Sequence, residues 1–176
     1  MSATRLAADA HALLTAAPPS DQRDAFLAQL SSYGDAGLRR EGPPEHFTAS
    51  AVVFSADRRE VLLVLHKKAR LWLQPGGHFE PGDTTVVGAA LREATEESGI
   101  AGLRAVPGAL FLDRHTLGES FGRCRAHLDL RIAATAPPDA AIAVSDESDD
   151  VRWWPVAALP DDTDPGLADC VATLRA

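Results

Sequence analysis

Residues 74–100 read QPGGHFEPGDTTVVGAALREATEESGI and change character partway along. The first ten positions hold two prolines and three glycines, which predicts a loop whose backbone can approach other groups closely. Helical periodicity returns at about residues 84–98, and Gly99 is placed to end that helix. The apolar residues of the predicted helix share one face: Val87, Ala90, Leu91 and Ala94. The stretch therefore predicts a glycine-rich loop leading into an amphipathic helix.

The last turns of this helix concentrate negative charge. Glu93, Glu96 and Glu97 fall near its C-terminal end, where the helix dipole disfavours carboxylates. Glu93 and Glu97 are also an i, i+4 pair of like charges, which costs about a few tenths of a kcal/mol. No lysine follows Lys68 to offset them. Three carboxylates in this pattern favour a site for hard divalent cations, Mg²⁺ or Mn²⁺, which take oxygen ligands.

The loop and helix together resemble the Nudix box over residues 77–100. That pattern is Gly, five residues, Glu, seven residues, then Arg-Glu-aliphatic-x-Glu-Glu-x-Gly-aliphatic, and residues 92–100 read REATEESGI. Two departures occur: Asp83 stands where the family has Glu, and eight residues separate it from Arg92. An extra residue inside a helix would rotate its two halves by about 100°. We therefore expect the loop or the first helical turn to absorb it.

The resemblance implies a fold, a reaction and a set of site residues. The fold is a Nudix-type α/β/α sandwich with a mixed sheet, and the reaction is attack of water on phosphorus in the pyrophosphate linkage of a nucleotide-type substrate. The implied metal ligands are the backbone carbonyl of Gly76 and the side chains of Glu93, Glu96 and Glu97. Arg92 is implied to brace the glutamates and the loop, with Asp83 as its partner. Bound Mg²⁺ would offset the negative charge and lower the pKa of a bound water.

The general base varies in position across the family. Glu96 is our first candidate within the box, and Glu147 is the candidate in the acidic loop at residues 145–150, which could equally be an ordinary surface loop. The predicted catalytic set is therefore Arg92, Glu96, Glu97 and Glu147.

Four residues near the box are candidates for substrate contact: His78, Lys68, Arg70 and Trp72. Each has a plainer interpretation, since exposed basic residues are common and a tryptophan can simply pack. His66, His78 and His127 lack the spacing of a zinc set, which favours surface or satisfied core positions for them.

The chain length and charge limit the class of protein. A chain of 176 residues suits a single domain. The net charge is −8, and residues 71–176 hold seventeen acidic against eight basic residues. This excess of negative charge disfavours long nucleic acids but admits a nucleotide bridged by a metal ion. The two cysteines form no CxxC pair, the N-terminus does not resemble a leader, and no apolar run is long enough to span a bilayer. We expect a cytoplasmic protein without a membrane partner.

Residues 1–45 are expected to form a helical extension, broken at Pro18 and Pro19, that could cover one side of the domain or help form a homodimer. Residues 46–176 are expected to form the Nudix domain, which opens with a β-hairpin. Within it, the composition predicts strands at residues 47–55, 61–66, 105–112, 125–134 and 151–154, and a closing helix at residues 164–175.

Two other functions remain open from the sequence. One is a Nudix-fold nucleotide sensor with weak or no turnover, which the two box departures would suit. The other is an isoprenyl diphosphate isomerase of the same fold, which would use a cysteine and a glutamate for proton transfer.

Overall fold

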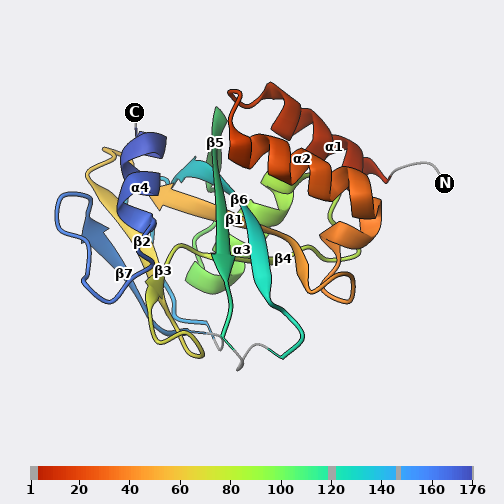
Figure 1. Ribbon diagram of the computed structural model, residues 1–176. Coiled ribbons are helices and arrows are strands. Elements are labelled where there is room, and N and C mark those ends of the chain that lie inside the picture. The colour runs from red at the N-terminus through yellow and green to blue at the C-terminus, as the bar shows by residue number, and fades with distance from the viewer. Residues whose placement is uncertain (1–3, 119–121, 146–147, 176) are drawn as a thin grey trace.

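The computed structural model describes residues 4–118, 122–145 and 148–175 (Figure 1). Its helices are α1 (Arg5–Ala16), α2 (Asp21–Tyr33), α3 (Val86–Ser98) and α4 (Leu167–Arg175), with a 3₁₀ turn η1 (Gly34–Leu38) after α2. Its strands are β1 (Glu45–Phe54), β2 (Glu60–His66), β3 (Trp72–Leu73), β4 (Gly76–His78), β5 (Arg104–Thr116), β6 (Ala126–Thr135) and β7 (Ser148–Pro155). Among the described residues, no helix is long and apolar enough to cross a membrane.

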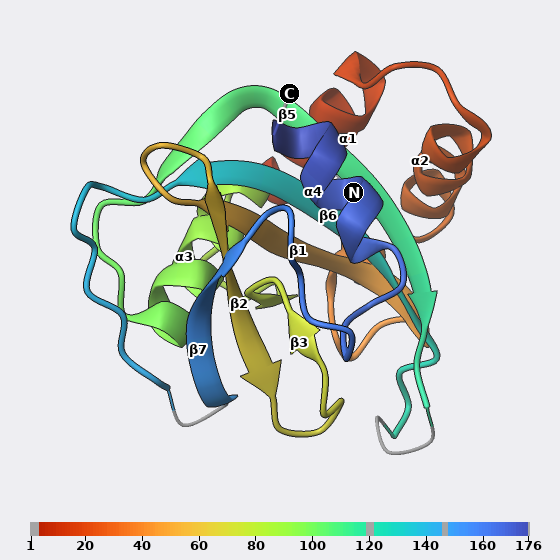
Figure 2. The same ribbon diagram turned by 90° about the vertical axis from the view of Figure 1, so that its left-hand side faces the viewer.

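The strands form one mixed sheet. Its main path runs β3-β2-β1-β6-β5, while β4 pairs with β1 and β7 pairs with β2. Strands β1 and β6 are parallel and stay in register from Glu45 opposite Ala126 to Phe54 opposite Thr135. The other pairings are antiparallel, and Figure 2 shows β7, β2 and β3 side by side.

A separate hydrophobic core lies on each face of the sheet. Phe47 and Ala49 of β1 belong to a core shared with α1, α2 and α3. Val52 and Phe54 of the same strand belong to the other core, shared with α4. This alternation follows from the two-residue period of a strand, which points successive side chains to opposite faces. Figure 1 shows the resulting arrangement, with α4 on one side of the sheet and α1 and α2 on the other, which confirms the predicted α/β/α sandwich.

The N-terminal helices pack directly on the sheet. Phe26 of α2 meets Phe47 of β1 edge to face, with ring centroids 5.7 Å apart. Asp9 of α1 accepts a 2.8 Å hydrogen bond from the backbone N–H of Val86, the first residue of α3. The first N–H groups of a helix have no partner within the helix, so Asp9 satisfies one of them. The predicted helical hairpin is present, and it covers one side of the sheet and supports the start of α3.

The prediction that residues 74–83 form a loop throughout is wrong at residues 76–78, which form β4. This short strand pairs with β1, placing Gly76 opposite Ser50 and His78 opposite Thr48. A Cβ at residue 76 would collide with the Ser50 hydroxyl, so glycine is what permits this close pairing. A three-residue strand is too short to show a two-residue period in the sequence, and the two-residue β3 was missed for the same reason.

Candidate catalytic and metal site

Helix α3 is regular from Val86 to Ser98, so the extra residue of the box lies outside it. The hydroxyl of Thr85 accepts a 3.0 Å hydrogen bond from the Gly88 N–H and caps the helix. Asp83 lies two residues before this cap, in the non-helical segment. The helix ends at Gly99, whose φ of 71° is left-handed as glycine allows. The structure thus confirms that the loop absorbs the extra residue.

Arg92 joins the loop to the glutamates. Its Nε and Nη2 donate to the two carboxylate oxygens of Asp83, at 3.2 and 2.9 Å, and Nη2 also donates to the His78 carbonyl at 3.2 Å. Its Nη1 donates to Glu93 and to Glu96, at 3.0 Å each. The hydrogen bonds to Asp83 and the charge of Glu93 raise the pKa of Arg92 above its usual range. Arg92 is therefore in the bracing position that the resemblance implied.

Two of the box carboxylates lie against Gly76 and Gly77. The backbone N–H of Gly76 donates to Glu97 at 3.2 Å. A Cβ on Gly77 would lie 2.8 Å from the carboxyl atoms of Glu93, so any other residue would displace that carboxylate. The Glu93 side chain is 13% exposed and Glu97 is buried, whereas the Glu96 side chain is 57% exposed. Two carboxylates thus lie against the loop, and the third faces solvent beside them.

This donor set suits a hard divalent cation. Carboxylates from Glu93, Glu96 and Glu97 together with a backbone carbonyl offer only oxygen ligands, which Mg²⁺ prefers. Nη1 of Arg92 forms an ion pair with both Glu93 and Glu96, so the Arg92 guanidinium neutralises part of the charge of these two carboxylates. In this arrangement the three box glutamates do not form a compact ligand cluster. Among the described residues, there are sets of three or more His, Cys, Asp or Glu side chains with ligand atoms all within 4.8 Å of one another, but none of these sets includes a box glutamate.

The residues predicted to contact substrate differ in exposure and in their partners. Lys68 is exposed in the turn after β2, while Arg70 forms a 2.6 Å ion pair with Asp149. Trp72 is buried and packs edge to face on Trp154, with ring centroids 5.3 Å apart. Its surroundings therefore fit the simpler interpretation, that this tryptophan packs in the protein interior. Glu147 lies outside the described residues.

The side chain of His78 turns away from the box glutamates and meets other histidines. Its Nε2 lies 3.0 Å from Nε2 of His46, and its ring also contacts that of His127. Burial lowers the pKa of His78 to about 4 and that of His127 to about 3, with the neighbouring imidazoles adding to the effect, so both rings are neutral at pH 7. His66 lies elsewhere, at the end of β2, where its Nδ1 accepts from the Ala69 N–H.

A buried polar network next to Gly76 was not predicted. Ser50, whose hydroxyl lies under Gly76, donates to Asp129 at 2.8 Å, and Asp129 pairs with the fully buried Arg131 at 2.9 Å. Arg131 also pairs with Asp113 and Asp164, at 2.7 and 2.9 Å. The sequence did carry a signal, since polar residues 127, 129 and 131 alternate with apolar residues 128, 130 and 132. That alternation is typical of a strand with one polar face.

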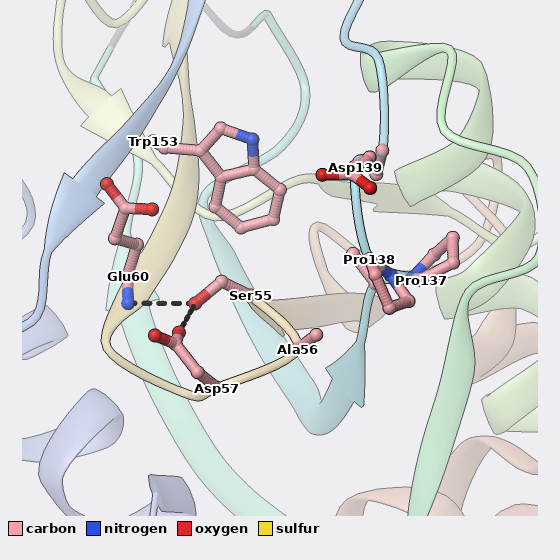
Figure 3. Close-up of a pocket in the computed structure, with 10 residues that line it drawn as sticks. Ser55, Ala56, Asp57, Glu60, Pro137, Pro138, Asp139 and Trp153 are labelled. Atoms are coloured by element: carbon pink, nitrogen blue, oxygen red, sulfur yellow. Dashed lines mark hydrogen bonds between the residues drawn. The ribbon is translucent and has the colours of Figure 1, made fainter.

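A hollow of about 360 Å³ lies at the far end of β1 from the glycine loop (Figure 3). It is lined by the β1–β2 turn and by residues 136–140, and it shares no residue with the box. Its charged lining residues are Asp57, Glu60 and Asp139, which would repel a phosphate. The lining of the hollow therefore does not favour a phosphate by itself.

Replacing Asp83 with alanine is expected to lower the free energy of unfolding by about 1.5–3 kcal/mol. The substitution removes the charge-assisted hydrogen bonds between Asp83 and Arg92, and the Asp83 side chain is only 9% exposed. Urea unfolding at pH 7 measures the loss. Asp24→Ala is the control, since Asp24 pairs with Arg23 but is 64% exposed, and it should cost no more than about 1 kcal/mol. Equal losses in the two variants would show that Asp83 does not anchor the loop.

Comparisons with known proteins agree on the fold. The Ap4A hydrolase of C. elegans superimposes with a TM-score of 0.62 at 17% identity, over 72% of this chain and 93% of that one. A MutT protein from Methanosarcina mazei Go1 gives 0.59 at 18% identity, over 75% and 94%. The E. coli dihydroneopterin triphosphate pyrophosphohydrolase gives 0.58 at 17% identity, over 71% and 91%. A comparison with curated protein sequences found no match.

The sandwich, the glycine loop and the glutamate-bearing helix together define a Nudix-type fold. A family model described as the NUDIX domain matches residues 44–174, and the chain belongs to that family. It is a Nudix-type pyrophosphohydrolase, an enzyme that acts on phosphoanhydride bonds, and Nudix hydrolases use a divalent metal.

Proposed function

We propose that this protein hydrolyses the pyrophosphate linkage of a small nucleotide-type substrate in a reaction that depends on Mg²⁺, with Mn²⁺ as a substitute. The observation that carries the proposal is the seating of two carboxylates against two glycines, Glu97 at Gly76 and Glu93 at Gly77, with exposed Glu96 alongside. The substrate is a nucleoside diphosphate joined to another group, and water attacks at phosphorus.

Each candidate site residue of the box has a proposed role. Glu93, Glu96, Glu97 and the Gly76 carbonyl would hold the metal, which when bound supplies positive charge for the phosphoryl oxygens and lowers the pKa of a bound water. Glu96, whose side chain is 57% exposed, is also our first candidate to accept the proton of the attacking water, because a general base must lie within hydrogen-bond reach of that water. Arg92 would hold Glu93 and Glu96 in place through its Nη1. Glu147 remains our alternative candidate for the base.

Positive charge for the outer phosphate would come from the turn between β2 and β3. Lys68 is exposed there, and Arg70 lies in the same turn with its side chain 72% exposed. Arg70 would have to exchange its ion pair with Asp149 for a phosphate, whereas Lys68 can extend to one from solvent. Lys68 is therefore the better candidate of the two.

The fold neighbours support a small-molecule substrate. Two of them are named for Ap4A and for dihydroneopterin triphosphate, which are small phosphorylated compounds. The net charge of −8 fits the same proposal, because a metal-bridged nucleotide can approach an acidic protein where a long nucleic acid would be repelled.

A substrate screen tests the proposal. The purified protein is incubated with Mg²⁺ and ADP-ribose, dinucleoside polyphosphates, nucleoside triphosphates or nucleotide sugars, and released products are separated by chromatography. We expect cleavage of at least one compound, abolished by EDTA and restored by added Mg²⁺. A thermal shift without any product would instead identify a nucleotide sensor and overturn the proposal.

The cysteines give little support to the isomerase alternative. Burial raises the pKa of the Cys170 thiol to about 12, which makes it a weak proton donor at neutral pH. Cys124 is also buried, among the histidines near His78.

A further inference from the structure

Four metal-ligating side chains meet beside the glycine loop, on the side away from the box glutamates. They come from four separate segments: His46 of β1, His78 of β4, His127 of β6, and Cys124 just before β6. One ligand atom from each lies within 4.8 Å of all the others. We propose that these residues form a closed, four-coordinate Zn²⁺ site, separate from the metal site of the hydrolase.

The spacing of the three imidazole rings fits a tetrahedral ion. The ring centroids are 5.1 Å apart for His46 and His78, 5.2 Å for His46 and His127, and 5.1 Å for His78 and His127. A tetrahedral Zn²⁺ with bonds of about 2.0–2.1 Å to nitrogen places the centroids of its imidazole ligands about 5.2 Å apart. The three rings thus already have the separation that a shared zinc ion requires.

The ring nitrogens are also oriented for binding. Nδ1 of His46 lies 2.9 Å from the Pro43 carbonyl, which can only accept, so Nδ1 carries the proton and donates it. Nε2 of the same ring therefore presents a lone pair to the cluster, 3.0 Å from His78 Nε2. A backbone hydrogen bond of this kind is what fixes the tautomer of metal-bound histidines in known sites.

His127 supplies an independent indication of a ligand. Its Nε2 is buried and has no hydrogen-bond partner among the described residues. A buried polar nitrogen without a partner costs about 1–3 kcal/mol, so such atoms are uncommon in native proteins. A zinc ion at the centre of the cluster would satisfy this nitrogen.

The donor chemistry selects zinc over magnesium. Three neutral imidazoles and one thiolate are borderline or soft ligands, which Zn²⁺ accepts and Mg²⁺ does not. Cys124 would release its thiol proton on binding, leaving a site with a net charge of about +1. His46 is fully buried, Cys124 is 7% exposed, and His78 and His127 are half-buried. Four protein ligands would fill all four positions of a tetrahedral ion, which is typical of structural zinc.

Zinc at this position would fix the catalytic loop. His46 and His127 lie opposite each other in the parallel β1–β6 pair, and His78 ends β4, directly after Gly76 and Gly77. The His78 carbonyl also accepts the hydrogen bond from Arg92. The ion would therefore tie β1, β4 and β6 together at the residue that links the sheet to the glutamate site.

Metal content and a cobalt spectrum test this proposal without reference to activity. The protein is loaded with Zn²⁺ and passed through a metal-free desalting column, and retained zinc is measured by mass spectrometry. In parallel, Co²⁺ is added to metal-free protein. We expect one tightly held zinc per chain and an intense tetrahedral cobalt spectrum with a thiolate-to-cobalt charge-transfer band. Absence of retained zinc, or a weak octahedral spectrum, would overturn the proposal on the wild-type protein alone.

Variants assign the ligands. Cys124→Ser should lose the charge-transfer band, and His127→Ala should lose tight zinc binding. Cys170→Ala is the matched control for the thiol, and His11→Ala, on the exposed face of α1, is the control for a histidine; both should bind zinc as the wild type does. A charge-transfer band that survives in Cys124→Ser would refute the assignment.

Glu97→Gln separates this site from that of the hydrolase. This variant should retain its tightly bound zinc, because Glu97 contributes only to the glutamate site. Loss of zinc from Glu97→Gln, with retention in Cys124→Ser, would show that the bound zinc belongs to the glutamates and would overturn the second site. Failure of the zinc site leaves the hydrolase proposal untouched, and the reverse also holds.

Discussion

Replacing Glu97 with glutamine lowers Mg²⁺-dependent cleavage by about a thousandfold or more, since a catalytic metal supplies several kcal/mol of transition-state stabilisation and each 1.4 kcal/mol is a factor of ten. The substitution keeps the size of the side chain and its ability to accept from the Gly76 N–H, but removes the negative charge. Its expected effect is therefore on metal binding and turnover rather than on the fold.

Steady-state rates with the best compound from the substrate screen, measured across a series of Mg²⁺ concentrations, check this expectation. Glu80→Gln is the matched control, because Glu80 lies 3.8 Å from Arg92 but is 62% exposed and lies outside the proposed ligand set. It should retain nearly full activity. Full activity in Glu97→Gln, with an unchanged circular dichroism spectrum in both variants, would remove Glu97 from the metal site.

Replacing Arg131 with methionine is expected to lower the free energy of unfolding at pH 7 by about 3–5 kcal/mol, because it leaves buried carboxylates without their cation. Arg131 is fully buried and pairs with Asp113, Asp129 and Asp164. A loss of this size is a large fraction of the roughly 5–15 kcal/mol that stabilises a typical domain. Urea unfolding at pH 7 measures it.

The pH dependence of this loss distinguishes a charge effect from a packing effect. Burial alone would raise the pKa of Asp129, but in the wild type the charge of Arg131 lowers this pKa below its ordinary value. The stability that the Asp129–Arg131 pair adds is therefore present at neutral pH. It is lost only as the pH falls through the lowered pKa of Asp129. Without Arg131, burial would raise the pKa of Asp129. The carboxylate would then take up a proton as the pH falls from 7 towards about 4, and the difference between variant and wild type should narrow.

Arg114→Met is the control, since Arg114 pairs with Glu45 and both side chains are 44% exposed. It should cost less than about 1 kcal/mol at pH 7. If Arg131→Met costs no more than this control, or if its cost does not change with pH, the buried pairs do not stabilise the fold as described.

The parts that could be predicted from the sequence were local. The spacing of REATEESGI predicted helix α3, and the composition of the preceding residues predicted the close backbone approach at Gly76 and Gly77. The pair between Asp83 and Arg92 followed from the family pattern despite its two departures. The helix and the Asp83–Arg92 pair each depend on residues less than about one helix length apart in the chain.

The parts that could not be predicted depend on which strands become neighbours. Arg131 meets Asp113 and Asp164 only because β5 and β6 pair and because the segment before α4 folds back onto them, whereas Asp129 precedes Arg131 by two residues on β6 itself. This network uses three of the acidic residues that give residues 71–176 their excess of negative charge. In this structure those carboxylates neutralise a buried arginine.

The histidines illustrate the same limit. His78 and His127 are 49 positions apart in the sequence, and no spacing rule joins them. The structure brings them together with His46 and Cys124 because β1 lies between β4 and β6, while His66 lies elsewhere. The sequence favoured surface or satisfied core positions for His66, His78 and His127, and it could not show that His78 and His127 lie together in half-buried positions.

The fate of the oxygen of water is the most direct test of a metal-dependent attack at phosphorus. The compound cleaved fastest in the substrate screen is incubated with the protein and Mg²⁺ in ¹⁸O-labelled water, and the products are analysed by mass spectrometry. The account predicts cleavage only with the metal present and a single ¹⁸O atom in one of the two phosphate-bearing products. Absence of any Mg²⁺-dependent product across the screen, or products whose phosphates carry no ¹⁸O, would contradict it.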